Sequence, residues 1–357
     1  MDSPDDRDRS LSQRGRMSPD LSAPDVRGVR RFLESRGVNV AGPLTSELVS
    51  GGQSNLTYII TDGVQRWVLR RPPVSGLTPS AHDVAREWRV TRALRHSAVP
   101  VPAAVALCED PVVLGAPFAV TGFVPGQVLR TRAQLDAHTS RELEGCVTEL
   151  VRILADLHSV DAAEVGLDGL GRPDGFLERQ VRLWWRQWSE VKDRDLTDAT
   201  RLYARLLAAL PGTTAHIGVV HGDYRIDNTL LDGEDITKVL AVVDWELATV
   251  GDVQTDIALM CVYRQPQLDL ILGFDAAWAS DRLPDGDAIA EAYARRRGVS
   301  LDHWPFYLAL ANFKLAVIAQ GISYRARRGA AADATSVLAE RAVPALLAAG
   351  LRELREP

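Results

Sequence analysis

The chain has 357 residues, which is enough to bury a large core in one domain or in two lobes. A formal net charge of -6 argues against a general nucleic-acid binder. No uninterrupted apolar run of about 18 residues occurs, and the charged N-terminus lacks the apolar segment of a secretory signal. We therefore expect a cytoplasmic protein that does not bind membranes. Three widely spaced cysteines, Cys108, Cys146 and Cys261, favour reduced thiols over a metal site.

The first third of the chain is predicted to be rich in β-strands. Residues 1–23 are polar and charged, and we expect them to form a disordered tail. The sequence pattern then predicts a helix over 25–36, strands over 46–49, 56–61 and 66–71, a helix over 80–95, and strands over 103–107 and 117–121. Asp62-Gly63 is a hairpin turn signal between the second and third strands.

The rest of the chain is predicted to be mostly helical. Residues 122–126 are typical of a linker, and helical patterns follow over 141–160, 176–191, 196–210, 287–298, 302–327 and 334–353. We therefore predict an α+β, two-lobed protein. It would consist of a β-rich N-terminal lobe of residues 24–121, the linker, and a larger helical C-terminal lobe of residues 127–357.

The most informative segment is H-G-D-Y-R-I-D-N at 221–228, because its oxygen-bearing side chains lie beside strand-like runs. Asp223 follows a short apolar run, Asn228 directly precedes a second run, and Asp244 directly follows a valine-rich run. The turn-rich segment 232–235 separates the last two runs and predicts a hairpin. Such a hairpin would place Asn228 and Asp244 near one another at its open end.

These residue types suit phosphoryl transfer. Asp223 is the candidate base, which would orient a substrate hydroxyl. Asn228 and Asp244 are hard oxygen donors of the kind that Mg²⁺ prefers. Taken singly, Asp223 could cap a turn, Asn228 could precede a strand as a turn residue, and Asp244 could cap a strand end. The register of all three favours the catalytic interpretation.

The pattern H-G-D-x4-N, followed by an aspartate after a valine-rich strand, resembles the aminoglycoside phosphotransferase and choline kinase superfamily. That superfamily shares the two-lobed fold of protein kinases. The resemblance implies ATP as the phosphate donor, Asp223 as the catalytic aspartate, and Asn228 and Asp244 as Mg²⁺ ligands. Gly222 stands where protein kinases carry arginine, which indicates the small-molecule branch. Within that branch, segments 51–55 and 67–73 are most similar to the kinase-like domains found beside acyl-CoA dehydrogenases.

A glycine-rich segment, S-G-G-Q-S-N at 50–55, lies between two predicted strands. Small residues there let backbone amides approach phosphates. The segment does not match G-x-G-x-x-G, and a flexible turn is the alternative. Its position indicates nucleotide binding by Gly52, Ser54 and Asn55.

The strand that carries lysine in protein kinases carries Arg70 here, and no lysine precedes Lys192. Because side chains alternate along a strand, Arg70 rather than Arg71 is expected to face the nucleotide. Glu87 lies on the otherwise apolar stripe of the 80–95 helix and therefore needs a partner. By analogy with the kinase Lys–Glu pair, we expect an Arg70–Glu87 pair. A surface Arg70 with a solvent-facing Glu87 is the alternative.

Four further residues have two interpretations each. Asp252 and Asp256 resemble the family's acids that brace the catalytic loop, but Asp252 is equally consistent with a helix cap. Arg225 lies within reach of a transferring phosphate or is structural. His158 ends a helical run and is expected to be packed or capping rather than catalytic.

The phosphate acceptor is the least determined part of the prediction. From Cys261 onward the sequence contains 12 Lys/Arg and 11 Asp/Glu. It therefore shows no excess of acidic residues of the kind that would bind a polycationic aminoglycoside. The cluster Arg325, Arg327 and Arg328 could receive an anionic acceptor such as a hydroxyacyl-CoA, although a solvated helix end is favoured.

We predict an ATP- and Mg²⁺-dependent O-phosphotransferase that acts on a hydroxyl of a small molecule. A nucleotide-binding pseudokinase or regulatory module without turnover is the alternative, which Arg70 leaves open. Protein kinase activity is disfavoured, because no A-P-E-like segment follows Asp244. The sequence gives no indication of the oligomeric state.

Overall fold

The computed structural model describes residues 21, 23–50, 55–72, 83–212, 216–328 and 336–354. The chain divides into two compact units: one contains the chain up to Ala85 and Val105–Phe123, and the other contains Arg86–Ala104 and the chain from Val124. Most of the predicted tail lies outside the described residues. The predicted boundaries around a 122–126 linker stay a prediction, since most of the second helix groups with the larger unit.

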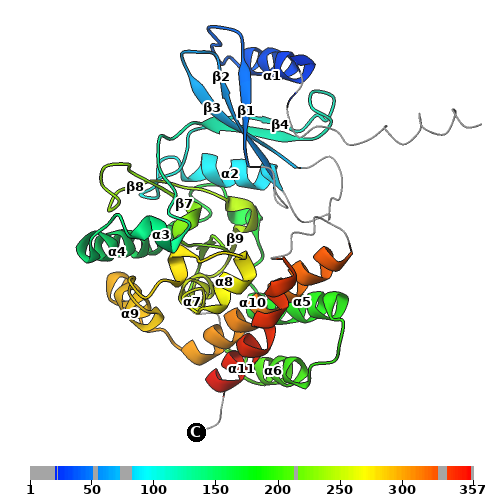
Figure 1. Ribbon diagram of the computed structural model, residues 1–357, viewed down its shortest axis with the longest axis vertical. Helices are drawn as coiled ribbons and strands as arrows, with labels where there is room; N and C mark the ends of the chain where they lie inside the picture. The colour runs from blue at the N-terminus through cyan, green and yellow to red at the C-terminus, as the bar shows by residue number, and fades with distance from the viewer. Residues whose placement is uncertain are drawn as a thin grey trace, which may run out of the picture. The chain divides into compact units, whose positions relative to one another are not determined.

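The first unit is built on a five-stranded sheet with the strand order β1-β2-β3-β5-β4 (Figure 1). Its elements are α1 (Ala23–Ser35), β1 (Thr45–Ser50), β2 (Leu56–Thr61), β3 (Arg66–Arg71), β4 (Ala104–Cys108) and β5 (Phe118–Gly122). The pairs β1–β2, β2–β3 and β3–β5 are antiparallel. Phe32 of α1 packs edge-on against Phe118, with ring centroids 5.2 Å apart.

The hairpin between β2 and β3 forms as the sequence predicted. The Asp62 carboxylate accepts hydrogen bonds from the backbone amides of Val64 at 2.9 Å and Gln65 at 2.7 Å, which closes the turn. Gly63 has φ of 88°, a conformation that costs glycine little. The turn therefore sets the register of β3, including the position of Arg70.

The second unit is mostly helical, with two short strand pairs. Its helices are α2 (Val84–Leu94, apart from its first two residues), α3 (Arg132–Leu135), α4 (Ser140–Leu157), α5 (Phe176–Val191), α6 (Thr197–Ala208), α7 (Gln254–Val262), α8 (Gln267–Leu272), α9 (Gly286–Arg297), α10 (Trp304–Arg327) and α11 (Val343–Glu353). The strands β6 (Ile217–Val220) and β9 (Thr249–Asp252) form one antiparallel pair. The strands β7 (Thr229–Leu231) and β8 (Val239–Val242) form the other.

Helix α10 is the central element of this core and packs against α5, α6, α7 and α11 (Figure 1). Within the part of the chain that the structure describes, it is the one helix whose length and composition would also suit a membrane span. However, 78% of its apolar window is buried inside the protein. Burial of that kind is typical of a core helix.

The predicted helices differ from the observed ones in two informative places. The sequence pattern missed α7, where eight of the nine residues are buried. A helix buried on all sides has no polar face, so its sequence shows no 3.6-residue hydrophobic period. The predicted helix over 334–353 divides into a 3₁₀ segment, Ser336–Ala342, and α11, which has Pro344 in its first turn.

Candidate active site

The predicted hairpin that brings Asn228 and Asp244 together is confirmed. Strands β7 and β8 pair antiparallel, with Thr229 opposite Val242. The amide of Val243 donates to the carbonyl of Asn228 at 3.0 Å, so the pairing continues to the residue before Asp244. Asn228 and Asp244 therefore lie at the same open end of the hairpin.

The carboxylate of Asp223 is held from both sides. The Asn228 amide nitrogen donates to the Asp223 backbone carbonyl at 2.8 Å and to Oδ2 at 2.9 Å. The hydroxyl of Tyr263 donates to Oδ1 at 2.5 Å. Because each carboxylate oxygen has its own donor, the orientation of Asp223 is fixed before any substrate binds.

A buried ion-pair network surrounds this carboxylate. The Arg225 guanidinium lies 3.6 Å from Asp223 Oδ2 and 3.0 Å from Asp227 Oδ1. Burial alone would lower the pKa of Arg225, but the charges of Asp223 and Asp227 outweigh burial and raise that pKa. Burial raises the pKa of Tyr263 well above its usual range, and the charge of Asp223 adds to the effect. Tyr263 therefore stays protonated as a donor, and Arg225 has a structural role in this arrangement.

Asp256 of α7 braces the backbone on which Asp223 stands. Its carboxylate accepts from the amides of His221 at 2.5 Å and Gly222 at 2.7 Å. His158 Nε2 lies 3.3 Å from the same carboxylate, and His158 Nδ1 lies 2.6 Å from the Tyr293 hydroxyl. Burial would raise the pKa of Asp256, but the hydrogen bonds from His158 and from the His221 amide help to lower it. Burial lowers the pKa of His158, so a neutral ring that donates to Asp256 fits the geometry.

The two candidate bracing acids have different roles. Asp252 Oδ1 accepts from the Gln254 amide at 3.0 Å, at the start of α7, and Oδ2 accepts from the Tyr307 hydroxyl at 2.7 Å. Asp252 thus holds the first amide of α7 and the Tyr307 hydroxyl, although Val253 is the N-cap of the helix. Asp256 holds the start of the segment 221–228, which is called the catalytic segment below after its proposed role. His158 is the last-turn cap of α4 and is buried, as the sequence indicated.

Gly222 is required by the backbone at this point. Its φ is 85°, and an added Cβ would lie 2.9 Å from the carbonyl oxygen of Leu247. Lys314 of α10 donates to the Gly222 carbonyl at 2.8 Å, and its ammonium lies 5.4 Å from the Trp184 ring centroid. Burial lowers the pKa of Lys314, which the charges of Asp223 and Asp256 oppose. An arginine at position 222, as in protein kinases, would not fit this turn.

The donor set at the hairpin end fits magnesium. Both hydrogen bonds of the Asn228 side chain use its amide nitrogen, which leaves its carbonyl oxygen available as a ligand. Asp244 has φ of 68°, a left-handed conformation that aspartate tolerates better than most residues. Among the described residues, no group of three or more His, Cys, Asp or Glu side chains would hold a metal by itself. A cation here would need further oxygens, such as those of phosphates.

The predicted nucleotide-binding residues lie in different parts of the chain. Gly52 and Ser54 lie outside the described residues, and Asn55 is 2% exposed at the start of β2. Arg70 is half-buried on β3, opposite Thr57 and Ala119. Glu87 is 8% exposed in the first turn of α2. Because Arg70 and Glu87 belong to different units, their pairing stays a prediction.

Arg71 lies on the other face of β3, as strand alternation predicted. It is buried, and its guanidinium donates to the Leu114 carbonyl at 3.2 Å and to the Tyr58 hydroxyl at 3.3 Å. At the end of α10, Arg327 forms ion pairs with Asp193 and Glu340. Arg328 stacks over Tyr324 with its guanidinium 4.5 Å from the ring centroid. These contacts favour the structural interpretation of the C-terminal basic cluster.

Two residues of this site escaped the sequence prediction. Lys314 had a signal, since it is a single cation inside a long apolar helix and one of only three lysines. Tyr263 had none, because it directly follows the uniformly buried helix α7 and reaches Asp223 only through the tertiary fold.

Comparisons with known proteins show the family and the fold of this chain. The profile of the phosphotransferase enzyme family matches residues 45–308. The mouse protein Acyl-CoA dehydrogenase family member 10 is 34% identical over 332 residues, which cover 88% of this chain but 31% of that protein. The chain thus spans about a third of the length of this curated relative.

Solved structures show the same fold. A protein of Ralstonia eutropha, described as a candidate aminoglycoside phosphotransferase, is 31% identical with a TM-score of 0.79, covering 92% of this chain and 97% of its own. Aminoglycoside phosphotransferase APH(4)-Ia, in a ternary complex with AMP-PNP and hygromycin B, has a TM-score of 0.59 at 16% identity, covering 90% and 98%. The predicted α+β, protein-kinase-like fold and the similarity to domains of acyl-CoA dehydrogenase family proteins are therefore confirmed. The chain belongs to the phosphotransferase enzyme family and has the fold of its small-molecule kinases.

Proposed function

We propose that this protein is an ATP- and Mg²⁺-dependent O-phosphotransferase that moves the γ-phosphate to a hydroxyl of a small molecule. The observation that carries the proposal is the carboxylate of Asp223, which Asn228 and Tyr263 hold at the hairpin end that also bears Asp244. A positioned acceptor carboxylate beside two hard oxygen donors is the arrangement that phosphoryl transfer needs. Family membership supports the same reaction class.

Each residue then has a distinct task. Asp223 accepts a hydrogen bond from the acceptor hydroxyl and aims its oxygen at the γ-phosphate. Asn228 and Asp244 would hold Mg²⁺, which when bound supplies positive charge against the phosphate oxygens. Tyr263 occupies Oδ1 of Asp223, so an acceptor hydroxyl must share that oxygen with it or take its place. Asp256 and Lys314 keep the segment rigid while this exchange occurs.

The nucleotide would be held by Gly52, Ser54, Asn55 and Arg70, with Glu87 as the partner of Arg70. Arginine binds phosphate as a planar fork rather than a point charge, so its presence in place of lysine is compatible with activity. AMP-PNP in the APH(4)-Ia complex supports a nucleotide as the donor. A cytoplasmic location, without nucleic-acid or membrane partners, is part of the same proposal.

A hydroxyacyl-CoA or another small alcohol is the acceptor that we favour over an aminoglycoside. The relationship to an acyl-CoA dehydrogenase family protein supports an acyl-CoA-linked substrate. The near balance of charge after Cys261 gives no acidic surface of the kind that a polycationic antibiotic requires.

An acceptor screen by coupled ADP release tests the proposal. The panel would contain hydroxyacyl-CoAs, choline-like alcohols and aminoglycosides, each with wild-type protein and with Asp223→Asn. We expect one acceptor class to stimulate ADP release, and the stimulation to fall by at least about 100-fold in the variant. Binding of Mg-ATP without turnover of any acceptor would instead favour a pseudokinase or regulatory module.

A further inference from the structure

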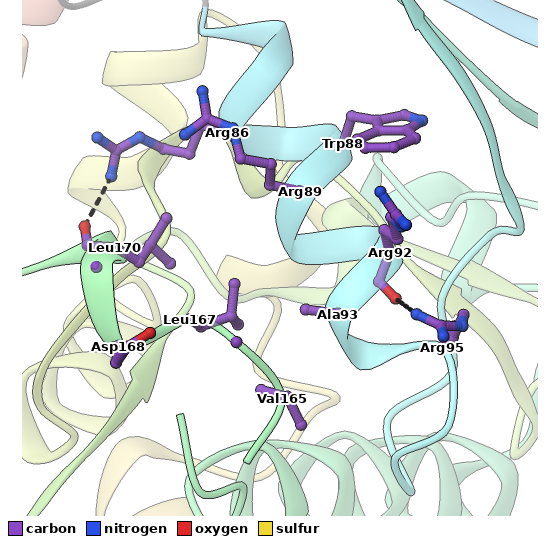
Figure 2. A pocket seen from close by; sticks show the side chains of 12 residues that line it. Arg86, Trp88, Arg89, Arg92, Ala93, Arg95, Val165, Leu167, Asp168 and Leu170 are labelled. Atoms are coloured by element: carbon purple, nitrogen blue, oxygen red, sulfur yellow. Dashed lines mark hydrogen bonds between the residues drawn. The ribbon is translucent and has the colours of Figure 1, made fainter. Parts of the chain in front are cut away.

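A concave surface lies between helix α2 and the loop 165–170. The cavity has a volume of about 460 Å³. In Figure 2, Arg86, Arg89, Arg92 and Arg95 line the α2 side of the pocket, and Leu167 and Asp168 belong to the loop on its other side. This arginine pocket lies wholly within the second unit.

The arginines are spaced three residues apart, which makes successive members neighbours along the helix. Such a row of like charges destabilises a helix unless anions neutralise it. The pocket lining contains four arginines and a single carboxylate, Asp168. In the part of the chain that the structure describes, Arg89, Arg92 and Arg95 take part in no ion pair.

Three arginines on other surface helices of the same unit have carboxylate partners. Arg152 lies 2.7 Å from Glu149, Arg182 lies 2.7 Å from Glu178, and Arg201 lies 3.4 Å from Asp198. Glu87 is the one acidic residue within α2, and it is buried. The pocket lining therefore carries an excess of positive charge in a chain whose net charge is negative.

The walls of the pocket are held by contacts with carbonyl groups and an aromatic ring and not by carboxylates. Arg86 donates to the carbonyls of Ala248 at 2.8 Å and Leu170 at 3.4 Å, and so connects α2 to the loop (Figure 2). Arg92 lies over the Trp88 ring, with its guanidinium 5.2 Å from the centroid. Two loop glycines, Gly166 and Gly169, leave open space where side chains would stand.

We propose that the arginine pocket binds a small ligand through two or more phosphate groups. Guanidinium groups recognise phosphate oxygens with paired N–H donors, and three exposed arginines in a row provide several such pairs. The cavity volume falls within the range of roughly 300–1,000 Å³ that is typical of small-molecule sites. Asp168 would face away from the phosphates or toward a neutral part of the ligand. The site is independent of the proposed transferase activity.

The test measures pyrophosphate binding by isothermal titration calorimetry at low ionic strength, without divalent cations, using the full chain. The variant Arg89→Gln/Arg92→Gln removes two charges from the pocket. The matched control Arg182→Gln/Arg201→Gln removes two charges from surface helices that do not line it. We expect the pocket variant to bind at least about tenfold more weakly, because each charge-assisted contact is worth roughly 1.5 kcal/mol or more. The control should bind like the wild type.

Equal weakening in both variants would reveal non-specific attraction and overturn the proposal, as would the absence of pyrophosphate binding to the wild type. A second arm uses ADP under the same conditions. If ADP fills a second site that is lost only in the pocket variant, the phosphates belong to a nucleotide. If pyrophosphate binds there and ADP does not, the ligand is a free polyphosphate. Either result supports the phosphate site.

Discussion

The catalytic segment and the arginine pocket both contain several charged groups within the second unit. The charges of the catalytic segment have partners, whereas three arginines of the pocket have no carboxylate partner in the described part of the chain. Around residues 221–228 every charged group has a partner: Asp223 has Asn228 and Tyr263, and Asp256 holds two backbone amides. Along α2, three exposed arginines follow one another without a carboxylate partner among the described residues. Paired charges fix the geometry of a segment, whereas unpaired charges leave it ready for a ligand. Substitutions in the two regions should therefore differ in sign and size.

The largest effect is expected from Asp256→Asn. The substitution weakens the hydrogen bonds that this buried carboxylate accepts from two amides and from His158. Each is worth about 1.5 kcal/mol or more because the acceptor is charged, so we expect a loss of about 3–5 kcal/mol. Urea unfolding would measure the change in the free energy of unfolding. A loss below about 1 kcal/mol would show that the catalytic segment does not depend on this brace.

The same variant should change the pH dependence of stability. The folded-state pKa of Asp256 lies below its ordinary value of 3.8, so the unfolded state binds more protons between those two values. The stabilisation from Asp256 is therefore complete above pH about 3.8 and disappears as the pH falls through the folded-state pKa. Unfolding curves at several acidic pH values should show the difference between wild type and Asp256→Asn shrinking toward low pH. A constant difference would contradict the ionised brace.

Gly222→Ala tests the backbone of the catalytic segment. A Cβ at φ of 85° and 2.9 Å from the Leu247 carbonyl should cost about 1–3 kcal/mol of stability. Thermal unfolding measures the loss, and Gly166→Ala is a matched control with a positive φ and open space around it. If both variants lose the same stability, the left-handed backbone alone accounts for the effect and the contact with Leu247 is unimportant.

Tyr263→Phe should affect activity more than stability. The change removes the donor to Asp223 Oδ1 while keeping the buried ring, so loss of one charge-assisted hydrogen bond of roughly 1.5 kcal/mol would lower kcat about tenfold. Steady-state kinetics with the acceptor found in the screen would measure it. An increase in kcat would mean that Tyr263 competes with the acceptor hydroxyl for that oxygen.

Arg89→Gln should give the smallest effect, and one of opposite sign. Removing one of a row of like charges should leave stability within about 0.5 kcal/mol of the wild type or raise it slightly. Chemical denaturation without phosphate would measure this difference. A loss of 2 kcal/mol would show that Arg89 has a structural partner and would remove the contrast between the two regions.

Local sequence signals predicted the elements that depend on local patterns. The strands β2 and β3 and the helix α5 have the predicted limits, because alternation or a helical stripe marks each one. The hairpin that joins Asn228 to Asp244 was predictable from its turn residues. These signals were enough to place Asn228 and Asp244 at one end of a hairpin.

The supporting residues were harder to predict, because their roles arise from contacts between distant elements. Helix α7 is buried on all sides, so its sequence shows no amphipathic period and nothing in it indicated Tyr263. The bracing role of Asp256 came from the family resemblance and not from a local pattern. The division of labour between Asp252 and Asp256 also depends on which one faces the amides of His221 and Gly222. Only the folded arrangement of α7 against the catalytic segment decides this.

The most direct test of the central claim is a single-turnover reaction with γ-labelled ATP and Mg²⁺, comparing wild type with Asp223→Asn. We expect both proteins to bind Mg-nucleotide with similar affinity, since Asn228 and Asp244 are unchanged. We also expect label to reach the acceptor hydroxyl only with the wild type, at a rate at least about 100-fold above that of the variant. Equal transfer rates in the two proteins would contradict the role of Asp223 and with it the proposed reaction.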